Sequence, residues 1–441
     1  MAGEGHSNPT LLSPTPDGWS VAAIEDLCEN VTSGGTPLRS DSSYYQGGIH
    51  SWFRTQELKD SILFESEEKI TDKALAQTSA KLFPKNTVLM AMYGDGKTIT
   101  SLGILAKEAA TNQACCAMIP DRVHCEPRFL FYALKHHRED FIRIASGGAQ
   151  RNLSGKLIRR FAINTPPLDE QRAIAHILGT LDDKIELNRR MKETLEAVAR
   201  ALFKSWFVDF EPVRAKAEGR DPGLPKPLTD LFPGSFEDSE LGEIPNGWDL
   251  AQLGTLVDFV KGKKPAHAAT SMADGLSPVI LIEGFEGKVS AYASAIGMVE
   301  VMADDVLMVM DGASSGRVET GCTGLVGSTL ARITPRGRLP GKRFLYFLLK
   351  HLEPSTRHHL TGTSIPHADK GWVAHQAVCF PKAPDLLNRF ENLAAHLRGK
   401  VDAARRESLS LAVLRDTLLP KLISGELRVP DADQFARGRE Q

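Results

Sequence analysis

The sequence is poor in cysteine: its 441 residues include only six, and none of them lies in a C-x-x-C pair. Scattered cysteines are typical of reduced thiols in a cytoplasm, so the sequence supports neither a zinc site nor a disulfide framework. Long apolar runs are also lacking, which argues against a transmembrane helix. The beginning, MAGEGHSNPTLLSPTPDGW, has neither a cationic start nor an apolar core and does not predict a signal peptide. We therefore expect a cytoplasmic protein that binds no metal.

An excess of charge of one sign is lacking as well. The formal net charge is −2 at pH 7, which excludes a generally basic nucleic-acid coat but leaves room for local patches that cancel in the sum. An apolar content of 42% over this length is enough for two or three globular domains with cores of their own. Any affinity for a polyanion is therefore expected to be confined to parts of the surface.

The second half of the chain repeats the first. Residues 15–27 (TPDGWSVAAIEDL) return as residues 244–256 (IPNGWDLAQLGTL). The register is held at four further pairs of segments, which are VLMAM at 88–92 and VLMVM at 306–310, RFLFYALKHH at 128–137 and RFLYFLLKHL at 343–352, INTPP at 163–167 and VCFPK at 378–382, and LFKSWFVDFEPV at 202–213 and LLPKLISGELRV at 418–429. Agreement at five sites indicates a duplication, and the long period predicts a domain with an appendage in each copy instead of a solenoid unit.

Each copy ends in a long helical pattern. Residues 168–207 contain no proline and one glycine, and Leu168-Asp169 is expected to provide the N-cap. Side chains at seven-residue intervals predict a seam of the coiled-coil type in each helix, so the two helices are expected to pair. Asn188 lies on this seam, either as a buried amide that fixes the register or as a polar residue tolerated where the seam is wet. The seam residues are Ile174, Leu181, Asn188, Leu195 and Leu202 and, 216 positions later, Phe390, Leu397, Ala404, Leu411 and Leu418, with Leu178, Ile185, Val198, Leu393, Val401 and Leu414 between them.

These patterns predict an α+β fold, with two duplicated domains of mixed helices and strands joined by two long coiled-coil helices. In the first domain, short strands and turns surround one helix at about 127–143. Prolines and glycines after the first long helix predict a connector that crosses the surface without forming a core. The predicted boundaries are 1–167 for the first domain, 168–213 for the first helical region, 214–243 for the connector, 244–384 for the second domain, 385–429 for the second helical region and 430–441 for a polar tail.

A basic stretch occurs at the same place in each domain. Residues 128–160 carry eight lysines and arginines against two acids, and residues 336–370 carry seven against two. Such a patch attracts a polyanion through counterion release, although a solvated helix face would have the same composition. The small-residue turns SGGAQRNL at 146–153 and TGTSIPHA at 361–368 follow and would let backbone approach a ligand closely. Because these turns differ between the copies, we expect two different readers of one extended partner such as DNA.

The segment VLMAMYGDGKTIT at 88–100 ends like a phosphate-binding loop. The pattern G-x-x-x-x-G-K-[ST] would need a glycine at position 91, which is alanine, and a helix after the loop. The residues that follow favour a strand, and the second copy keeps the strand but loses GKT. We therefore predict a hairpin tip that contacts the phosphate of DNA instead of that of ATP. The candidate DNA contacts on this tip, its counterpart, the two turns and the two basic stretches are Tyr93, Asp95, Lys97, Arg143, Arg151, Asn152, Ser314, Ser315, Arg317, Arg357, His367 and Lys370.

No set of residues predicts catalysis. NTPPL at 164–168 lacks the order of the Asn/Asp-Pro-Pro-aromatic motif of a methyltransferase, and no glycine-rich cofactor loop accompanies it. The acid near the hairpin tip lacks the Asp/Glu-x-Lys partner of a nuclease. Cys115 and Cys116 have no matching His/Asn pattern and are expected to be buried thiols. The histidine pairs at 136–137 and 358–359 are adjacent, which suits one metal poorly. We predict no catalytic residue and no metal ligand.

Together these segments resemble the specificity (S) subunit of Type I restriction–modification systems over nearly the whole chain. The most specific stretch, similar to the central region of that family, is PPLDEQRAIAHILGTLDDKIELNRRMKETLEAVARALFKSWFVDFEPVRAKAEGR. LGEIPNGW, SGGTP at 33–37, TNQA at 111–114, TGTSIPHADK at 361–370 and the terminal LLPKLISGELRV are also family-like. The first copy departs from the family at SGGAQRNLS, where the family more often has a form like that of the second copy.

The resemblance implies two target-recognition domains, each of which reads one half of a bipartite DNA sequence, and two antiparallel helices that set the spacer between the halves. It also implies docking of two methyltransferase (M) subunits, which use S-adenosylmethionine to methylate adenine N6, and of restriction (R) subunits where DNA is also cut. The S subunit itself binds no cofactor and performs no chemistry in this family. Two alternatives stay open at the level of the sequence: a coiled-coil scaffold that does not bind DNA, and a nucleotide-dependent enzyme.

Overall fold

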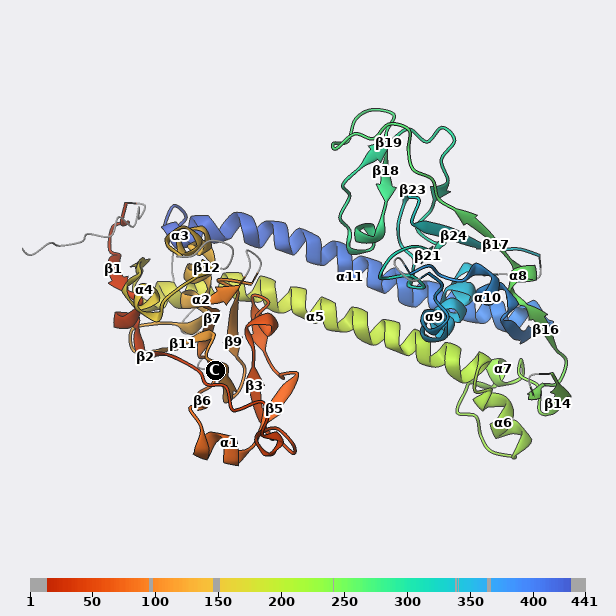
Figure 1. Cartoon of the computed structure of the whole chain (residues 1–441), viewed down its shortest axis with the longest axis horizontal. Coiled ribbons are helices and arrows are strands. Elements are labelled where there is room, and N and C mark those ends of the chain that lie inside the picture. The colour runs from red at the N-terminus through yellow and green to blue at the C-terminus, as the bar shows by residue number, and fades with distance from the viewer. Residues whose placement is uncertain are drawn as a thin grey trace, which may run out of the picture. The chain divides into compact units, whose positions relative to one another are not determined.

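The chain forms two compact units. The computed structural model describes residues 14–94, 98–145, 151–240, 242–337, 339, 341–362 and 366–429, and for Arg151 the backbone alone. Unit 1 contains the residues up to Asn188 and those from Arg406 onward, and unit 2 contains Arg189–Arg405. Each unit is a mixed α/β domain, and the long helices α5 (Leu168–Phe207) and α11 (Pro384–Ser424) each contribute to both (Figure 1). The predicted α+β architecture is confirmed.

The elements of unit 1 that precede α5 are short. In chain order they are β1 (Ser20–Ala23), η1 (Ile24–Leu27), β2 (Cys28–Ser33), η2 (Ser42–Tyr44), β3 (His50–Phe53), η3 (Thr55–Glu57), β4 (Ser61–Leu63), β5 (Glu68–Ile70), α1 (Asp72–Gln77), β6 (Leu82–Phe83), β7 (Val88–Ala91), β8 (Tyr93–Gly94), β9 (Leu102–Leu105), β10 (Ala109–Thr111), β11 (Cys115–Pro120), α2 (Pro127–His136), α3 (Arg138–Ile144), β12 (Arg151–Asn152), α4 (Gly155–Arg160) and β13 (Ala162–Thr165).

Two sheets pack in unit 1, one of five strands in the order β2-β11-β7-β9-β4 and one of four in the order β5-β3-β10-β6. Successive side chains of a strand point to opposite faces, so a strand buried on both sides is apolar throughout. In β7, Val88 and Met90 join the core that includes α2 and α5, whereas Leu89 and Ala91 join a second core with residues of β3 and β10. Helices therefore cover one face of the five-stranded sheet, and the second sheet covers the other.

The GDGKT segment lies between two antiparallel strands. β7 and β9 pair with Met90 opposite Leu102, and β8 pairs with β12 with Tyr93 opposite Asn152. The prediction of a strand on each side of the tip is therefore confirmed. A phosphate-binding loop would need a helix after GKT, and the next regular element here is the strand β9. Asp95, Gly96 and Lys97 lie outside the described residues.

Unit 2 contains a series of short elements between α5 and α11. They are α6 (Glu211–Ala217), α7 (Lys226–Thr229), β14 (Phe236–Ser239), β15 (Gly242–Pro245), β16 (Trp248–Gln252), α8 (Leu253–Leu256), β17 (Val257–Lys261), β18 (Ser277–Ile280), η4 (Ile282–Glu286), β19 (Tyr292–Ala293), β20 (Glu300–Val301), β21 (Val306–Val309), β22 (Val318–Glu319), β23 (Gly324–Val326), β24 (Leu330–Pro335), α9 (Lys342–His358), α10 (Lys370–His375) and β25 (Ala377–Pro381).

Unit 2 repeats the topology of unit 1, which confirms the duplication. Its sheet β17-β24-β21-β22 matches β2-β11-β7-β9, and its sheet β19-β18-β23-β20 contains a parallel pair, β18–β23, that matches the parallel pair β3–β10. The strand VLMV of β21 is again divided between two cores, with Val306 and Met308 on the helix side and Leu307 and Val309 on the other side.

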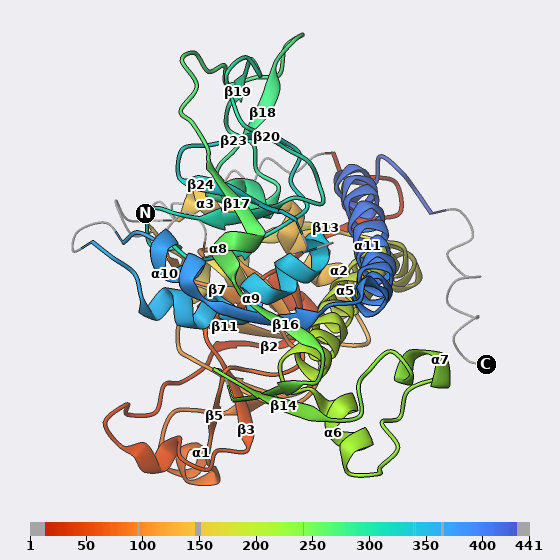
Figure 2. The same ribbon diagram turned by 90° about the vertical axis from the view of Figure 1, so that its right-hand side faces the viewer.

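The long helices pair in opposite directions. In unit 1, Asp182 of α5 binds Arg415 of α11 at 2.7 Å and Asn188 binds Glu407 at 2.8 Å, so the numbering rises along one helix as it falls along the other. α5 ends among the core residues of unit 2, to which it contributes Phe203, Trp206 and Phe207, and α11 ends in the core of unit 1. Figures 1 and 2 both show the two helices side by side.

The seam residues differ in burial. Ile174, Asn188, Phe390 and Ala404 are buried, and the other members of the seven-residue series are half-buried, namely Leu181, Leu195, Leu202, Leu397, Leu411 and Leu418. Val198 and Leu414, which the pattern places at intermediate seam positions, are 42% and 47% exposed, so that assignment is wrong. A pair of helices buries only a narrow stripe of each, and these two side chains stand outside it.

Three local predictions also need correction. The helix expected at 127–143 is two helices, because the backbone turns at His137, whose Nδ1 lies 2.8 Å from Oδ2 of Asp140. Helix α5 begins at Leu168, so Asp169 belongs to its first turn and is not the N-cap. The connector does form core: Phe232 is 2% exposed and packs edge-on against Trp206, with ring centroids 5.6 Å apart.

Candidate nucleic-acid interface

Four loops of unit 1 meet at one edge of the five-stranded sheet. The amide of Gly35 donates to the carbonyl of Thr111 at 2.9 Å, and the hydroxyl of Thr36 donates to the Gln113 side chain. On the other side of the same turn, the Met92 amide donates to the carbonyl of Ala114 at 2.9 Å. We call this the loop edge of unit 1, formed by residues 33–37, 92–94, 111–114 and 151–152. It joins the segments SGGTP and TNQA, which lie far apart in the sequence.

Unit 2 has a loop edge built in the same way, from residues 261–265, 310–311, 326–329 and 366–367. Lys263 donates its amide to the carbonyl of Val326 at 3.1 Å, as Gly35 does to Thr111. Met310 bonds Thr329 at 2.8 Å, as Met92 bonds Ala114. The equivalence places Asp311 where unit 1 has Tyr93 and His367 where it has Asn152, since both pairs are opposite each other in the strand register.

Charged side chains converge on the loop edge of unit 2. Nδ1 of His367 lies 2.7 Å from Oδ1 of Asp311, and Nζ of Lys261 lies 3.0 Å from Oδ2 of the same carboxylate. Partial burial tends to raise the pKa of Asp311, but the hydrogen bonds from His367 and Lys261 outweigh it and lower that pKa. Nζ of Lys370 stands 5.5 Å above the ring of Phe259 and is exposed. Cationic donors at the end of a strand suit phosphate or base edges.

The loop edge of unit 1 is different in chemistry. Tyr93 is 38% exposed and Asn152 is exposed beside it, with their backbones paired. The side chain of Arg151 and all of Asp95 and Lys97 lie outside the described residues. Behind the tip, Nη2 of Arg138 donates to Oδ1 of Asp60 at 2.5 Å and to the carbonyl of Thr100 at 3.3 Å. Arg138 therefore anchors the base of the hairpin loop.

Some of the predicted contacts have other roles. Ser315 is 1% exposed, and its hydroxyl lies within 2.7–3.2 Å of the carbonyls of Gly312, Pro366 and Met310, so it holds a turn and is closed to DNA. Arg317 binds Glu319 at 3.2 Å and lies over the ring of Phe285.

The remaining candidates are open to solvent to different degrees. Ser314 is half-buried. Arg143 is 66% exposed and pairs with Asp140, and Arg357 is 47% exposed and lies 3.4 Å from Glu353.

Several cations of the first basic stretch bind groups of unit 1, whereas Lys156 and Arg160 are exposed, so the structure does not support a DNA-facing patch formed by the whole stretch. Arg128 binds both oxygens of Asp183 at 2.9 Å, and Arg159 donates from Nε to the carbonyl of Val31 at 2.9 Å. Burial, with the charge of Arg415 added, lowers the pKa of Lys135. Their partners stand tens of residues away along the chain, so a count of charges within the stretch could not reveal them.

The second basic stretch is neutralised in the same way. Arg336 lies 3.1 Å from Asp258, Lys342 lies 3.0 Å from Asp304, and Lys350 lies 2.9 Å from Glu353. Arg338 lies outside the described residues. Of this stretch, Lys370 is exposed near the loop edge of unit 2, and the other exposed lysines of that edge come from a different segment.

That segment, KGKKP at 261–265, is not among the contacts predicted from the sequence. Lys261 binds Asp311, Lys263 donates to the carbonyl of Gly297 at 2.9 Å, and Lys264 is exposed with no partner among the described residues. The signal was present in the repeat, because these residues stand where the first copy has SGGTP. Three lysines in place of small neutral residues make the two loop edges unlike in charge.

The described part of the chain contains no cluster of three or more His, Cys, Asp or Glu side chains suited to a metal. Burial raises the pKa values of Cys115 and Cys116 to about 12, so neither thiol is a ready nucleophile near neutral pH. Unit 2 has a cavity of ≈ 320 Å³ among α5, α9 and α11, but its charged groups pair with one another, as Arg398 does with Asp402 at 3.0 Å. None of the helices, over the residues described, is long and apolar enough to cross a membrane.

Comparison with known proteins gives a consistent result. The family model described as the Type I restriction modification DNA specificity domain matches residues 16–197. Over 96% of both chains, the sequence is 26% identical to the Type I restriction enzyme MjaIX specificity subunit of Methanocaldococcus jannaschii. It is 27% identical to the Type I restriction enzyme HindI specificity subunit of Haemophilus influenzae, over 68% of this chain and 77% of the relative. The crystal structure of the Type I restriction–modification S subunit from M. genitalium has a similar fold, with a TM-score of 0.60 and 18% identity over 95% of this chain and 97% of that one.

Proposed function

Because this chain belongs to the family of Type I restriction–modification specificity subunits, we propose that it directs the complex of such a system to a bipartite DNA sequence. Each unit recognises one half-site through its loop edge. The observation that carries this proposal is the equivalence of the two edges, which share the same backbone hydrogen bonds and differ in the side chains that they present.

The side chains at the two edges suit different sequences. Tyr93 and Asn152 in unit 1 offer a phenol and an amide, and an amide can form two hydrogen bonds with adenine. Asp311 and His367 occupy the same places in unit 2, flanked by Lys261 and its neighbours. Lysines at a strand end contribute phosphate contacts, which position the protein without reading the sequence. An asymmetric target with two unlike halves follows from this difference.

The long helices dock two methyltransferase subunits. Val198 of α5 and Leu414 of α11 are exposed, and they are equivalent in the repeat, each standing 30 residues after the start of its helix. Exposed apolar side chains that recur at equivalent positions suit two copies of one partner. Leu187, Leu409 and Val413 are further exposed apolar residues of these helices.

Specificity subunits are non-catalytic, and the chemistry is assigned to the partners. The methyltransferase subunits bind S-adenosylmethionine and methylate adenine N6, restriction subunits join in a system that also cuts DNA, and the complex acts in the cytoplasm. Neither alternative is supported. A scaffold that does not bind DNA leaves the two unlike loop edges unexplained, and the GDGKT segment is followed by a strand where a nucleotide enzyme would need a helix.

Co-expression with a methyltransferase subunit from the same system tests the proposal. We expect the two chains to purify together, and we expect the complex, but not this chain alone, to transfer methyl groups from S-adenosylmethionine to DNA. Methyl transfer or ATP hydrolysis by the isolated chain would contradict a non-catalytic role. A complex that forms but shows no preference among DNA sequences would contradict the recognition role.

A further inference from the structure

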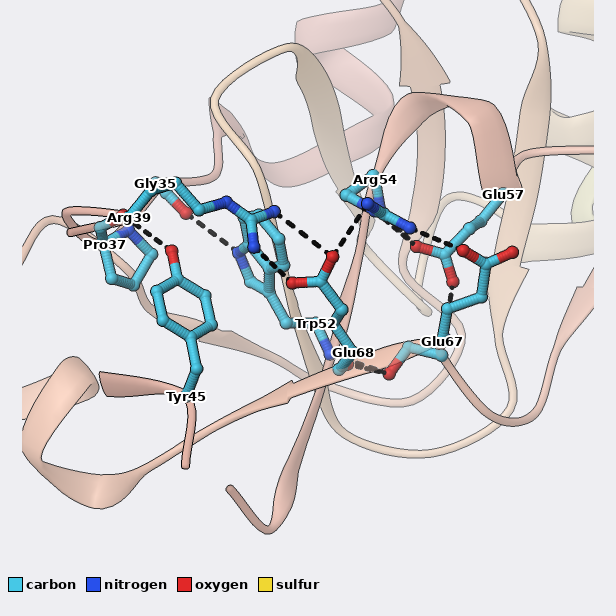
Figure 3. A network of polar contacts seen from close by, with 10 residues as sticks. Gly35, Pro37, Arg39, Tyr45, Trp52, Arg54, Glu57, Glu67 and Glu68 are labelled. Atoms are coloured by element: carbon cyan, nitrogen blue, oxygen red, sulfur yellow. Dashed lines mark hydrogen bonds and ion pairs between the residues drawn. The ribbon is translucent and has the colours of Figure 1, made fainter. Parts of the chain in front are cut away.

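A network of polar and aromatic side chains holds one arginine beside the loop edge of unit 1. The guanidinium of Arg39 lies over the rings of Tyr45 and Trp52, 4.8 and 4.9 Å from their centroids, and pairs with Glu68 (Figure 3). The rings are themselves fixed, since Tyr45 donates to the carbonyl of Pro37 at 2.6 Å and Nε1 of Trp52 donates to that of Gly35 at 3.0 Å. Arg39 nevertheless keeps 49% of its side chain exposed.

The network is continuous with the loop edge. Gly35, which accepts from Trp52, donates its amide to Thr111 at 2.9 Å, where the TNQA turn begins. The same turn ends at Ala114, whose carbonyl binds the amide of Met92, next to Tyr93. The network that holds Arg39 and the strand end that carries Tyr93 therefore contact the same TNQA turn, from opposite sides.

The guanidinium of Arg39 is held in a fixed plane and has N–H donors that Glu68 does not use. Glu68 accepts from Nη1 and, at 3.4 Å, from Nη2. A guanidinium has about five N–H donors, so Nε–H and further Nη–H groups stay available along its edges. Two N–H groups on one edge match O6 and N7 of guanine in the major groove. Stacking and the carboxylate fix the plane before binding, which reduces the entropy lost when those bonds form.

The charge around Arg39 disfavours a phosphate ligand. Arg54 lies 3.4 Å from Glu57, 2.5 Å from Glu67 and 2.8 Å from Glu68, so two guanidinium groups face three carboxylates (Figure 3). A phosphate would meet the repulsion of those acids, whereas a neutral base edge meets only directed N–H groups. This distinguishes Arg39 from the lysines at the edge of unit 2.

We propose that Arg39 is a specificity-determining residue that reads a G·C base pair in the half-site bound by unit 1, with Glu68, Tyr45 and Trp52 holding it in place. The inference rests on the proposed function and adds a residue and a base to it. This arginine is particular to unit 1, because the residue of unit 2 that follows KGKKP as Arg39 follows SGGTP is His267.

The test is the methylation pattern of complexes that contain Arg39→Ala or Arg39→Lys. For Arg39→Ala we expect one G·C position in one half of the bipartite motif to lose about 10- to 100-fold of its preference while the other half stays unchanged. Arg39→Lys keeps the charge but loses the planar fork, so we expect the same position to relax. Glu68→Gln, which weakens the support of Arg39, is expected to relax that position less.

Arg122→Ala is the matched control. Arg122 is also an exposed arginine of unit 1 next to a carboxylate, 3.8 Å from Glu126 and 56% exposed, but it follows the opposite end of β11. We expect the complex that contains Arg122→Ala to methylate the same motif as the complex with the unaltered protein. Thermal unfolding of each complex shows whether a variant is folded, and Arg39→Lys provides the answer if Arg39→Ala does not fold.

Three results would overturn the role of Arg39. The motif could be unchanged in the arginine variants. Binding could weaken equally for all sequences with a smaller salt dependence, which would identify a phosphate contact. The melting temperature could fall with no change of motif, which would identify a structural role. An unaltered protein that gives no bipartite motif would instead refute the proposed function itself.

Discussion

Asn188 of α5 donates a hydrogen bond from Nδ2 to Oε2 of Glu407 of α11 at 2.8 Å, although the asparagine is only 2% exposed. Among the described residues its Oδ1 has no partner. Of the two interpretations of this seam position, the buried amide is therefore the one observed. An amide that is half satisfied lowers stability, and its single bond to Glu407 favours one register of the helix pair.

Replacing this amide by an apolar side chain is expected to stabilise the protein. For Asn188→Leu we predict an increase of about 1–2 kcal/mol in the free energy of unfolding, because the unpaired oxygen is removed and Glu407 remains partly hydrated. Urea unfolding of the two proteins measures this difference in the free energy of unfolding. Asn188→Asp is the control, since a carboxylate next to Glu407 should lower the stability. A lower stability of the leucine variant would contradict this account of the seam.

Arg128 should prove structural in spite of its place in a basic stretch. Its paired hydrogen bonds to Asp183 link α2 to α5. We predict that Arg128→Met lowers the stability by about 1 kcal/mol, as expected for a partly exposed ion pair of good geometry, and leaves the salt dependence of DNA binding unchanged. Differential scanning calorimetry and binding titrations at several salt concentrations test the two parts. A reduced salt dependence would instead place Arg128 on DNA.

Lys264, in contrast to Arg128, should contribute to the salt dependence of DNA binding and not to stability. It is exposed at the loop edge of unit 2 and has no partner within the described ranges. For Lys264→Ala we predict unchanged stability and a salt-dependence slope, log K against log salt, that is smaller by about 1, without a change of sequence preference. Lys382→Ala, which removes an exposed lysine beyond the end of β25, is the control. Equal effects of both variants would argue against a phosphate contact at Lys264.

Asp60 should give the hairpin of unit 1 a stability that depends on pH. Burial tends to raise the pKa of Asp60, but the hydrogen bond and charge of Arg138 outweigh it, so the pKa is lower in the folded protein. The ionised Asp60 therefore adds to the free energy of unfolding above the pKa of the unfolded state, about 4. This stabilisation is lost as the pH falls through the lower pKa of the folded state.

The variant Asp60→Asn isolates this contribution, and asparagine tolerates the positive φ of residue 60. We predict that it is about 1–3 kcal/mol less stable than the unaltered protein at pH 7 and that the difference shrinks as the pH falls below about 4. Unfolding followed by circular dichroism over this pH range provides the measurement. A difference that does not depend on pH would exclude the carboxylate as its source.

The termini of the described chain should tolerate being joined. Arg428 donates from Nη1 to the carbonyl of Asp17 at 3.0 Å and binds Glu170, so the two ends lie together in unit 1. We predict that a circular permutant with new ends at the exposed residues Arg220 and Asp221 folds and still binds the same DNA. Loss of folding would show that the connector has to be continuous.

The duplicated fold could be predicted from the sequence because its signals are local. VLMAM and VLMVM fix a doubly buried strand in each copy, and the seven-residue series fixes the long helices. The site could be predicted only in part, because side chains acquire their roles from distant partners. Arg128 stands 55 residues from Asp183, and Phe232 enters a core built from segments before and after it. Arg39 owes its fixed plane to Trp52 and Glu68, whose approach no spacing in the sequence reveals.

We propose that the two unlike loop edges of this duplicated scaffold recognise the two halves of one DNA target. Single-molecule sequencing of DNA methylated by the complete complex tests it most directly, first with the unaltered protein and then with His367→Ala. We predict methylated adenines in a motif of two parts separated by a non-specific spacer, and a change confined to one part in the variant. Methylation within a continuous single-part site, or a change in both parts at once, would contradict recognition of one half-site by each loop edge.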